Sequence, residues 1–242
     1  FKPGGIVSVC DVKVLNKNPI DILDILLKKG VQNIMKQEIP AVFQTIGSDF
    51  AGSNLEAGEG LRDQLFILRT NFSAVYKNND PFPLRETECA YLPLTTVIRD
   101  RVGQFLTYEK LFGYSLILAC PISKPDMLDD DRMVTKDYMT TLSIIETIFQ
   151  TAIACNHKIL VLTPFGLEDE DDNPIDDIIK IYNFCIYKYG HKFKNIILSV
   201  PEYLPKSVYE LFNDNLVKRA LRFFNNDSFW LVAPHKLFEP EI

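Results

Sequence analysis

The sequence lacks the features of a membrane protein, a disulfide scaffold and a metalloprotein. No apolar run reaches the ~18 residues that a helix needs to cross a bilayer, and no targeting signal is visible. The five cysteines are scattered, and no two of them have the C-x-x-C spacing of a redox or zinc motif. The three histidines (His157, His191 and His235) lie far apart, and none has a partner at metal-ligand spacing. We therefore expect buried free thiols in a reducing intracellular compartment, with no metal and no cofactor.

Positive charge is also scarce. The chain has 26 Lys and Arg residues against 32 Asp and Glu, which gives a formal net charge of −6. This balance disfavours a broad phosphate-backbone footprint, although a local basic patch is compatible with it. The length of 242 residues and the hydrophobic share of 47% suit one large soluble domain. Since neither a repeat nor a dividing linker is visible and the first residue is Phe1, we expect residues 1–242 to form a single α/β domain of a longer protein.

Strand-like and helix-like patterns alternate along the chain. The expected strands are residues 6–10, 41–46, 90–94, 95–100, 114–119, 158–162, 194–200 and 228–232. The expected helices are residues 20–29, 61–76, 135–156, 175–189 and 206–225. Such alternation predicts a three-layer α/β fold.

The segment from Leu160 to Pro174 has the architecture of a phosphate site. An apolar strand runs into a loop, and a helix pattern follows from Ile175, which is where α/β proteins often bind phosphate. The loop, however, has one glycine and five consecutive carboxylates from Glu168 to Asp172. Glycines let backbone N–H groups approach a phosphate, whereas carboxylates repel it.

Four segments, in this order and spacing, resemble the microbial type of poly(ADP-ribose) glycohydrolase, a branch of the macro domains. They are Ala41-Val42-Phe43-Gln44-Thr45 followed by Ala51-Gly52-Ser53, Tyr91-Leu92-Pro93 with Val97-Ile98-Arg99-Asp100, Leu116-Ile117-Leu118-Ala119-Cys120-Pro121, and Leu160-Val161-Leu162 through Gly166 to Asn173-Pro174. The resemblance covers roughly Val42 to Val200. It implies an α/β/α macro-domain-like fold with a mixed central sheet.

The resemblance also implies roles for particular residues. Asp11 sits where macro domains often use an aspartate to accept from the adenine amino group, although an Asp after a strand is commonly a turn residue. Gly52 and Ser53 would belong to the first phosphate loop. The second loop would contribute Thr163, Phe165 and Gly166.

Both loops depart from the family pattern. The family's catalytic glutamate pair would fall near Asp63 and Gln64, where glutamine cannot act as an acid and aspartate is one methylene shorter. A 1 Å misplacement can cost ~100-fold in rate. The glycine triplet is reduced to Gly52, and Pro164 removes an N–H donor from the second loop. The sequence therefore predicts a catalytically degenerate module, structural or interacting, whose partner is another protein or its own parent polypeptide.

Other interpretations stay open. ADP-ribose binding or hydrolysis with rearranged residues is one alternative, and a nucleic-acid contact through Lys188, Lys192 and Lys194, with aromatic neighbours, is another. The acidic run at 168–172 is interpreted as a solvated loop at the start of a helix or a surface for a partner, and Arg99-Asp100 as a local ion pair. Richness in Lys, Asn and Ile fits an AT-rich genome, such as that of a virus or a parasite.

Overall fold

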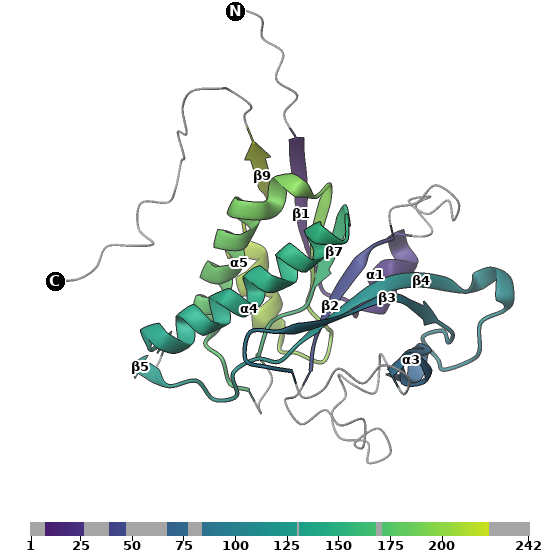
Figure 1. Ribbon diagram of the computed structural model, residues 1–242, viewed down its shortest axis with the longest axis horizontal. Helices are drawn as coiled ribbons and strands as arrows, with labels where there is room; N and C mark the ends of the chain where they lie inside the picture. The colour runs from purple at the N-terminus through teal and green to yellow at the C-terminus, as the bar shows by residue number, and fades with distance from the viewer. Residues whose placement is uncertain are drawn as a thin grey trace, which may run out of the picture.

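Seven strands form one mixed sheet in the order β3-β4-β2-β7-β8-β1-β9 (Figure 1). The structure is a computed structural model that describes residues 8–26, 39–46, 67–76, 84–129, 131–167 and 171–222. The strands of the sheet are β1 (Ser8–Leu15), β2 (Ala41–Thr45), β3 (Cys89–Val97), β4 (Phe112–Ala119), β7 (Ile159–Leu162), β8 (Asn195–Ser199) and β9 (Arg219–Arg222). The five inner strands run parallel, and the two edge strands, β3 and β9, run antiparallel to their neighbours.

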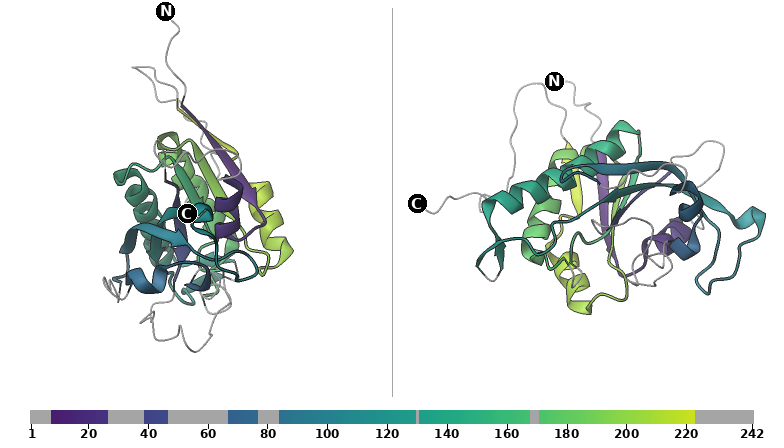
Figure 2. Two further views of the ribbon diagram at one scale, coloured as in Figure 1. Left: turned by 90° about the vertical axis from the view of Figure 1, so that its right-hand side faces the viewer. Right: turned by 60° about the horizontal axis from the view of Figure 1, so that its bottom comes forward.

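Helices lie on both faces of the sheet. The helices are α1 (Pro19–Leu26), α3 (Phe72–Tyr76), α4 (Thr135–Ala154), α5 (Ile175–Tyr189) and α6 (Lys206–Asn215). In the first view of Figure 2, α4 and α5 lie on one side of the sheet and α1 on the other. The three-layer α/β/α arrangement with a mixed sheet is therefore confirmed.

The two faces have separate apolar cores because successive side chains of a strand point in opposite directions. Phe43 of β2 packs in one core with α4 and α5, whereas the adjacent Val42 packs in the other core with α1 and α3. Every residue of β2 and β7 is buried, as expected of parallel strands covered on both faces. This is why β7 reads as an unbroken apolar run and β2 begins with one, from Ala41 to Phe43.

Two predicted helices have wrong boundaries. The helix expected at 61–76 is interrupted at Thr70, which forms a bridge with Val97, and residues 61–66 lie outside the described part. Asn71 completes the break, since its N–H donates to Thr96 O (2.9 Å) and its Oδ1 accepts from Thr96 N (2.7 Å). The Thr and Asn side chains thus offer the backbone an alternative to helical bonding.

The helix expected at 206–225 ends at Asn215 instead. The N–H of Val217 donates to the Asn183 side chain of α5 (2.8 Å), and residues 219–222 then pair with β1 as β9. Tertiary pairing has here overridden a helical pattern. The strand expected at 228–232 lies outside the described residues.

Two extended segments were also wrongly bounded. The strand expected at 6–10 continues to Leu15, because Val12 and Val14 point into the core and the backbone pairs with β8 on one side and β9 on the other. The loop expected at 123–131 contains a small hairpin made by β5 (Met127–Asp129) and β6 (Arg132–Met133).

Candidate functional site

The parallel strands β1, β2, β4, β7 and β8 all end at one edge of the sheet, called here the carboxyl edge. Open α/β sheets bind their ligands outside this edge, in the loops that follow the strands. The described loops there are the β1–α1 turn, the residues after β4, the β7–α5 loop and the residues after β8. The site is built from these loops.

The β7–α5 loop fills its own interior. The side chain of Phe165 is fully buried, and its ring stacks on that of Phe43 with centroids 5.9 Å apart. Gly166 has φ +63°, and a Cβ added there would lie 2.6 Å from the Asn173 Nδ2 atom. The only glycine of the loop therefore makes room for a side chain of the same chain.

Hydrogen bonds fix this loop to the sheet and to α5. The Tyr182 hydroxyl donates to Thr163 O (2.5 Å), and the Asn173 N–H donates to Gly166 O (2.8 Å). The Asn173 side-chain amide donates to Ile122 O in the segment after β4 (2.8 Å). Each of these bonds turns a polar group of the loop toward protein, so the described part of the loop is braced in one conformation.

A small cavity lies on the α1 side of the sheet, near the start of α1. Its lining consists of Asn18, Pro19, Ile20, Val42, Gln44, Tyr114, Leu116, Pro201 and Tyr203. The volume open to the centre of a water molecule is about 10 Å³, which is the room that one ordered water needs. A cavity of this size has no room for a nucleoside.

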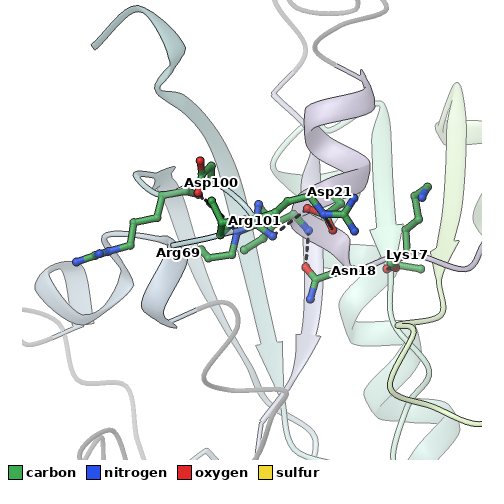
Figure 3. Close-up of polar contacts among 10 residues, drawn as sticks. Lys17, Asn18, Asp21, Arg69, Asp100 and Arg101 are labelled. Carbon is green, nitrogen blue, oxygen red and sulfur yellow. Dashed lines mark hydrogen bonds and ion pairs between the residues drawn. The ribbon is translucent and has the colours of Figure 1, made fainter. Parts of the chain in front are cut away.

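A buried charge cluster lies at the start of α1 (Figure 3). Asp21 accepts from Arg69 Nη1 (2.9 Å) and from Arg101 Nε (3.1 Å), with only 9% of the Asp21 side chain exposed. Asn18 positions the carboxylate, because its Oδ1 caps the helix by accepting from Ile20 N (3.0 Å). The cluster joins α1 to the segment before α3 and to the chain that follows β3.

Local sequence signals reveal only part of this cluster. An Asn at the cap, Pro19 at the first helical position and an acid in the first turn are readable signals of a helix start. The two arginines are 48 and 80 positions further along the chain, at Arg69 and Arg101. No local pattern connects them to Asp21.

Asp11 does not lie where the sequence placed it. It is within β1, opposite Asn195 and Arg219, and not in a turn after the strand. Its carboxylate forms an ion pair with Lys13 (2.7 Å) on a half-exposed part of the strand. The reason for expecting Asp11 at an adenine is therefore wrong, because four more residues separate it from the carboxyl edge.

Several other expected site residues lie outside the described part of the chain. Gly52, Ser53, Asp63 and Gln64 are among them, as are the first three residues of the acidic run at 168–172. Of the remaining two, Asp171 is buried and Asp172 is exposed.

Arg99 and Asp100 do not form the expected local ion pair. Arg99 donates to Gly103 O (2.9 Å) and lies over the Phe105 ring, whereas Asp100 Oδ1 accepts from the N–H groups of Val102 and Gln104. Both residues organise one turn of the chain.

The expected basic patch is partly neutralised. Lys188 pairs with Glu146 of α4 (2.6 Å), and this contact raises the pKa of the Lys188 ammonium. Lys192 and Lys194 are exposed, but Phe193 between them is buried. The patch therefore has no aromatic side chain between its two remaining lysines on which a base could stack.

The cysteines are free thiols, but not all are buried. Cys10 and Cys185 are buried, Cys89 and Cys120 are half-buried, and Cys155 is exposed. Burial raises the pKa of the Cys10 thiol to about 12, so it stays protonated and unreactive. Within the described residues there is no cluster of side chains that could hold a metal ion, and no helix is long and apolar enough to cross a membrane.

A polar network lies between β3, β4 and the end of α4. His157 Nδ1 is 2.8 Å from Ile39 O, so this nitrogen carries the proton, and Nε2 accepts from the Tyr91 hydroxyl (2.9 Å). Ser115 lies beside the same hydroxyl and donates to Pro93 O (2.7 Å). Burial lowers the pKa of His157, which favours this neutral form.

Comparison with known proteins gives structural matches only. No protein-family model and no curated protein matches the sequence. Poly(ADP-ribose) glycohydrolase from Thermomonospora curvata matches with a TM-score of 0.67 and 14% identity, over 89% of this chain and 80% of that chain. The Deinococcus radiodurans enzyme in complex with ADP-ribose matches with a TM-score of 0.67 and 13% identity, over 84% of this chain and 83% of that chain.

A third match is the T. curvata enzyme bound to the inhibitor ADP-HPD, with a TM-score of 0.63 and 15% identity, over 84% of this chain and 78% of that chain. The identities are low, and each match covers most of both chains. The chain thus has the macro-domain-like fold of the microbial poly(ADP-ribose) glycohydrolases.

Proposed function

We propose that this chain is a macro-domain-like module of the glycohydrolase type that has lost efficient ADP-ribose chemistry and serves as an interaction module. The observation that carries the proposal is the β7–α5 loop. At the position where the fold would grip a diphosphate, Phe165 faces the core and Asn173 covers Gly166.

Electrostatics support the proposal. A diphosphate at this loop would meet the carboxylates of residues 168–172. At ~4 Å and an effective dielectric constant of ~20, each like-charge pair costs about 4 kcal/mol. The N-terminus of α5 offers only about 0.3–1 kcal/mol to an anion. Repulsion therefore outweighs what the helix contributes.

The catalytic position supports it as well. By the family's spacing, its glutamate pair would fall near Asp63 and Gln64. Neither combines the length and the acidity of glutamate, so protonation of the leaving ribose oxygen lacks its usual donor.

The test measures release of ADP-ribose from a labelled polymer by the purified chain. We expect no release above the protein-free background, and no difference between the wild type and Asp63→Ala. Release at a rate that Asp63→Ala abolishes would contradict the proposal.

A second candidate is retained ADP-ribose binding without turnover. Two observations favour it: the fold is shared with an enzyme crystallised with ADP-ribose, and α5 begins at the carboxyl edge. Calorimetry at millimolar ADP-ribose separates the two candidates. Saturable heat that is reduced by Tyr203→Ala supports binding at this edge, whereas no heat at millimolar ligand removes the second candidate.

A further inference from the structure

The chain between β3 and β4 presents apolar side chains to water. Residues 98–111, called here the aromatic arm, lie at one end of the long axis of the molecule (Figure 1). Phe105 is 68% exposed, Tyr108 is 87% exposed, and Val102 is also exposed. Exposed apolar groups that gather on one segment commonly mark an interaction site.

The aromatic arm is held in one conformation by its own hydrogen bonds. Arg99 and Phe105 form an antiparallel bridge, and the Leu106 N–H donates to Ile98 O (2.9 Å). Gly103 adopts φ +83° at the tip, which a glycine tolerates without strain. An ordered arm loses little conformational entropy when a partner covers it.

A buried carboxylate anchors the arm to the rest of the fold (Figure 3). The side chain of Arg101 extends from the arm and pairs with Asp21 at the start of α1 (3.1 Å). Asp21 also pairs with Arg69. The guanidinium of Arg99 lies 3.8 Å from the centroid of Phe105 and covers one face of that ring. The arm is thus a braced surface that combines aromatic rings with guanidinium groups.

The opposite end of the molecule is acidic and hollowed. The hairpin of β5 and β6 and the first turns of α5 border a surface hollow of about 380 Å³ that is open to solvent, called here the acidic hollow, which is lined by Asp129, Asp131, Arg132, Asp176 and Lys180. Leu128, which is exposed, lies on the hairpin that borders it. Its volume is in the range of pockets that hold small organic groups, so an aromatic side chain fits.

The described segments that border the hollow are acidic. Residues 124–129 and 131–137 have four Asp against three Lys and Arg, and residues 171–180 have four Asp against one Lys. Together these segments have a net charge of −4. The arm has a net charge of the opposite sign, with Arg99, Arg101 and Lys110 against Asp100 and Glu109.

We infer that copies of this chain associate head to tail, with the aromatic arm of one copy seated in the acidic hollow of the next. Charge and shape favour a second copy as the occupant, because each surface supplies what the other lacks. The two surfaces lie at opposite ends of the molecule, so the arm cannot fill the hollow of its own chain (Figure 1). A contact between two different surfaces is heterologous and extends beyond a dimer unless rotation closes a ring.

Sedimentation velocity over a concentration series tests this with the wild-type chain alone. We expect a weight-average mass that rises with concentration past that of a dimer, and a smaller rise at high salt because the contact is charged. A chain that stays monomeric at every concentration, or a mass that stops at a dimer, overturns the inference. The inference is also overturned if the chain is monomeric and its arm binds single-stranded nucleic acid, as measured by a gel shift.

Paired variants locate the contact. Phe105→Ser with Tyr108→Ser removes the rings of the arm, and Asp131→Lys with Asp176→Lys reverses the charge of the hollow. Each double variant should weaken association at least ~10-fold. Tyr187→Ser and Asp214→Lys change an aromatic ring and a charge elsewhere on the surface and should leave association unchanged. Equal weakening in the controls overturns the assignment of the surfaces.

Mixing supplies the sharpest result. The arm variant keeps an intact hollow, and the hollow variant keeps an intact arm, so the equimolar mixture should form 1:1 dimers and nothing larger. A mixture that remains monomeric while the wild type associates would show that the two surfaces do not meet each other, and would overturn the inference.

Discussion

The β7–α5 loop and the aromatic arm differ in the burial of their aromatic side chains. In the loop, Phe165 points inward and stacks on Phe43, so the place where this fold binds ligands elsewhere is filled by protein. In the arm, Phe105 and Tyr108 point into water on a backbone that is equally well hydrogen-bonded. The difference suggests that the surface of this molecule most suited to contact a partner is a projecting arm and not the concave edge of its sheet.

Removing the two phenylalanine rings should have very different effects on stability. We expect Phe165→Ala to lower the free energy of unfolding by about 3–5 kcal/mol, because it opens a cavity next to Phe43 in the core between the sheet and the helices α4 and α5. Phe105→Ala should change it by less than about 0.5 kcal/mol, because the ring is mostly in water. Urea denaturation of both variants checks this. Similar losses for the two would mean that the arm packs against the body of the protein.

The arginines that hold Asp21 should also differ. Replacement of the buried Arg69 by methionine should destabilise the fold by about 3 kcal/mol, because it leaves a buried carboxylate with one partner. Arg101→Met removes a guanidinium that is 59% exposed and should cost less than about 1 kcal/mol. The midpoints of chemical unfolding decide the order, and a larger loss for Arg101→Met would show that Arg101, and not Arg69, is the main partner of Asp21.

Two glycines with positive φ allow a matched comparison of the two regions. Gly103→Ala has nothing within 4 Å of the new methyl group and should cost about 1 kcal/mol of backbone strain. Gly166→Ala adds a clash with Asn173 Nδ2 and should cost at least about 2 kcal/mol. Thermal unfolding measures both. Equal costs would indicate that Asn173 can move away and that the loop is less tightly filled than its contacts indicate.

The smallest expected effect is a dependence on pH. Burial lowers the pKa of His157 below its usual 6.5, so the unfolded chain binds its proton more readily than the folded chain does. The contribution of this residue to stability is therefore complete above pH ~6.5. It falls as the pH drops toward the lowered pKa, with a slope of at most about 1.4 kcal/mol for each pH unit. Comparison of denaturation curves at pH 7.5 and 5.5 for the wild type and His157→Gln checks it, since the variant should lose this part of the dependence.

Elements with a strong local pattern could be predicted from the sequence. The helix at 175–189 has the bounds that its apolar spacing predicted, and the buried strands β2, β4, β7 and β8 lie where apolar runs placed them. The errors fell where distant backbone decides the outcome. The helix is interrupted at Thr70 because this residue pairs with Val97. Arg219 to Arg222 form a strand because they pair with the edge of β1.

The site was harder to predict than the fold. From the sequence alone, a phenylalanine in a loop can be a ligand contact or a core residue. The structure shows that Phe165 is a core residue, because its ring stacks on that of Phe43. The pairing of Asp21 with Arg69 and Arg101 depends on three segments that are remote in the sequence. Such contacts are set by packing, which one sequence without relatives does not reveal.

The position of β1 in the sheet has a consequence for the order of folding. β1 lies between β8 and β9, so the first strand of the sheet is flanked only by the last two. During synthesis β1 cannot pair until residues 195–222 have left the ribosome. Until then its apolar side chains lack their final neighbours. Pairing across such a sequence separation is slow, and exposed strands in the waiting chain invite misassembly. The nascent chain is therefore expected to need protection by chaperones until its C-terminal part is made.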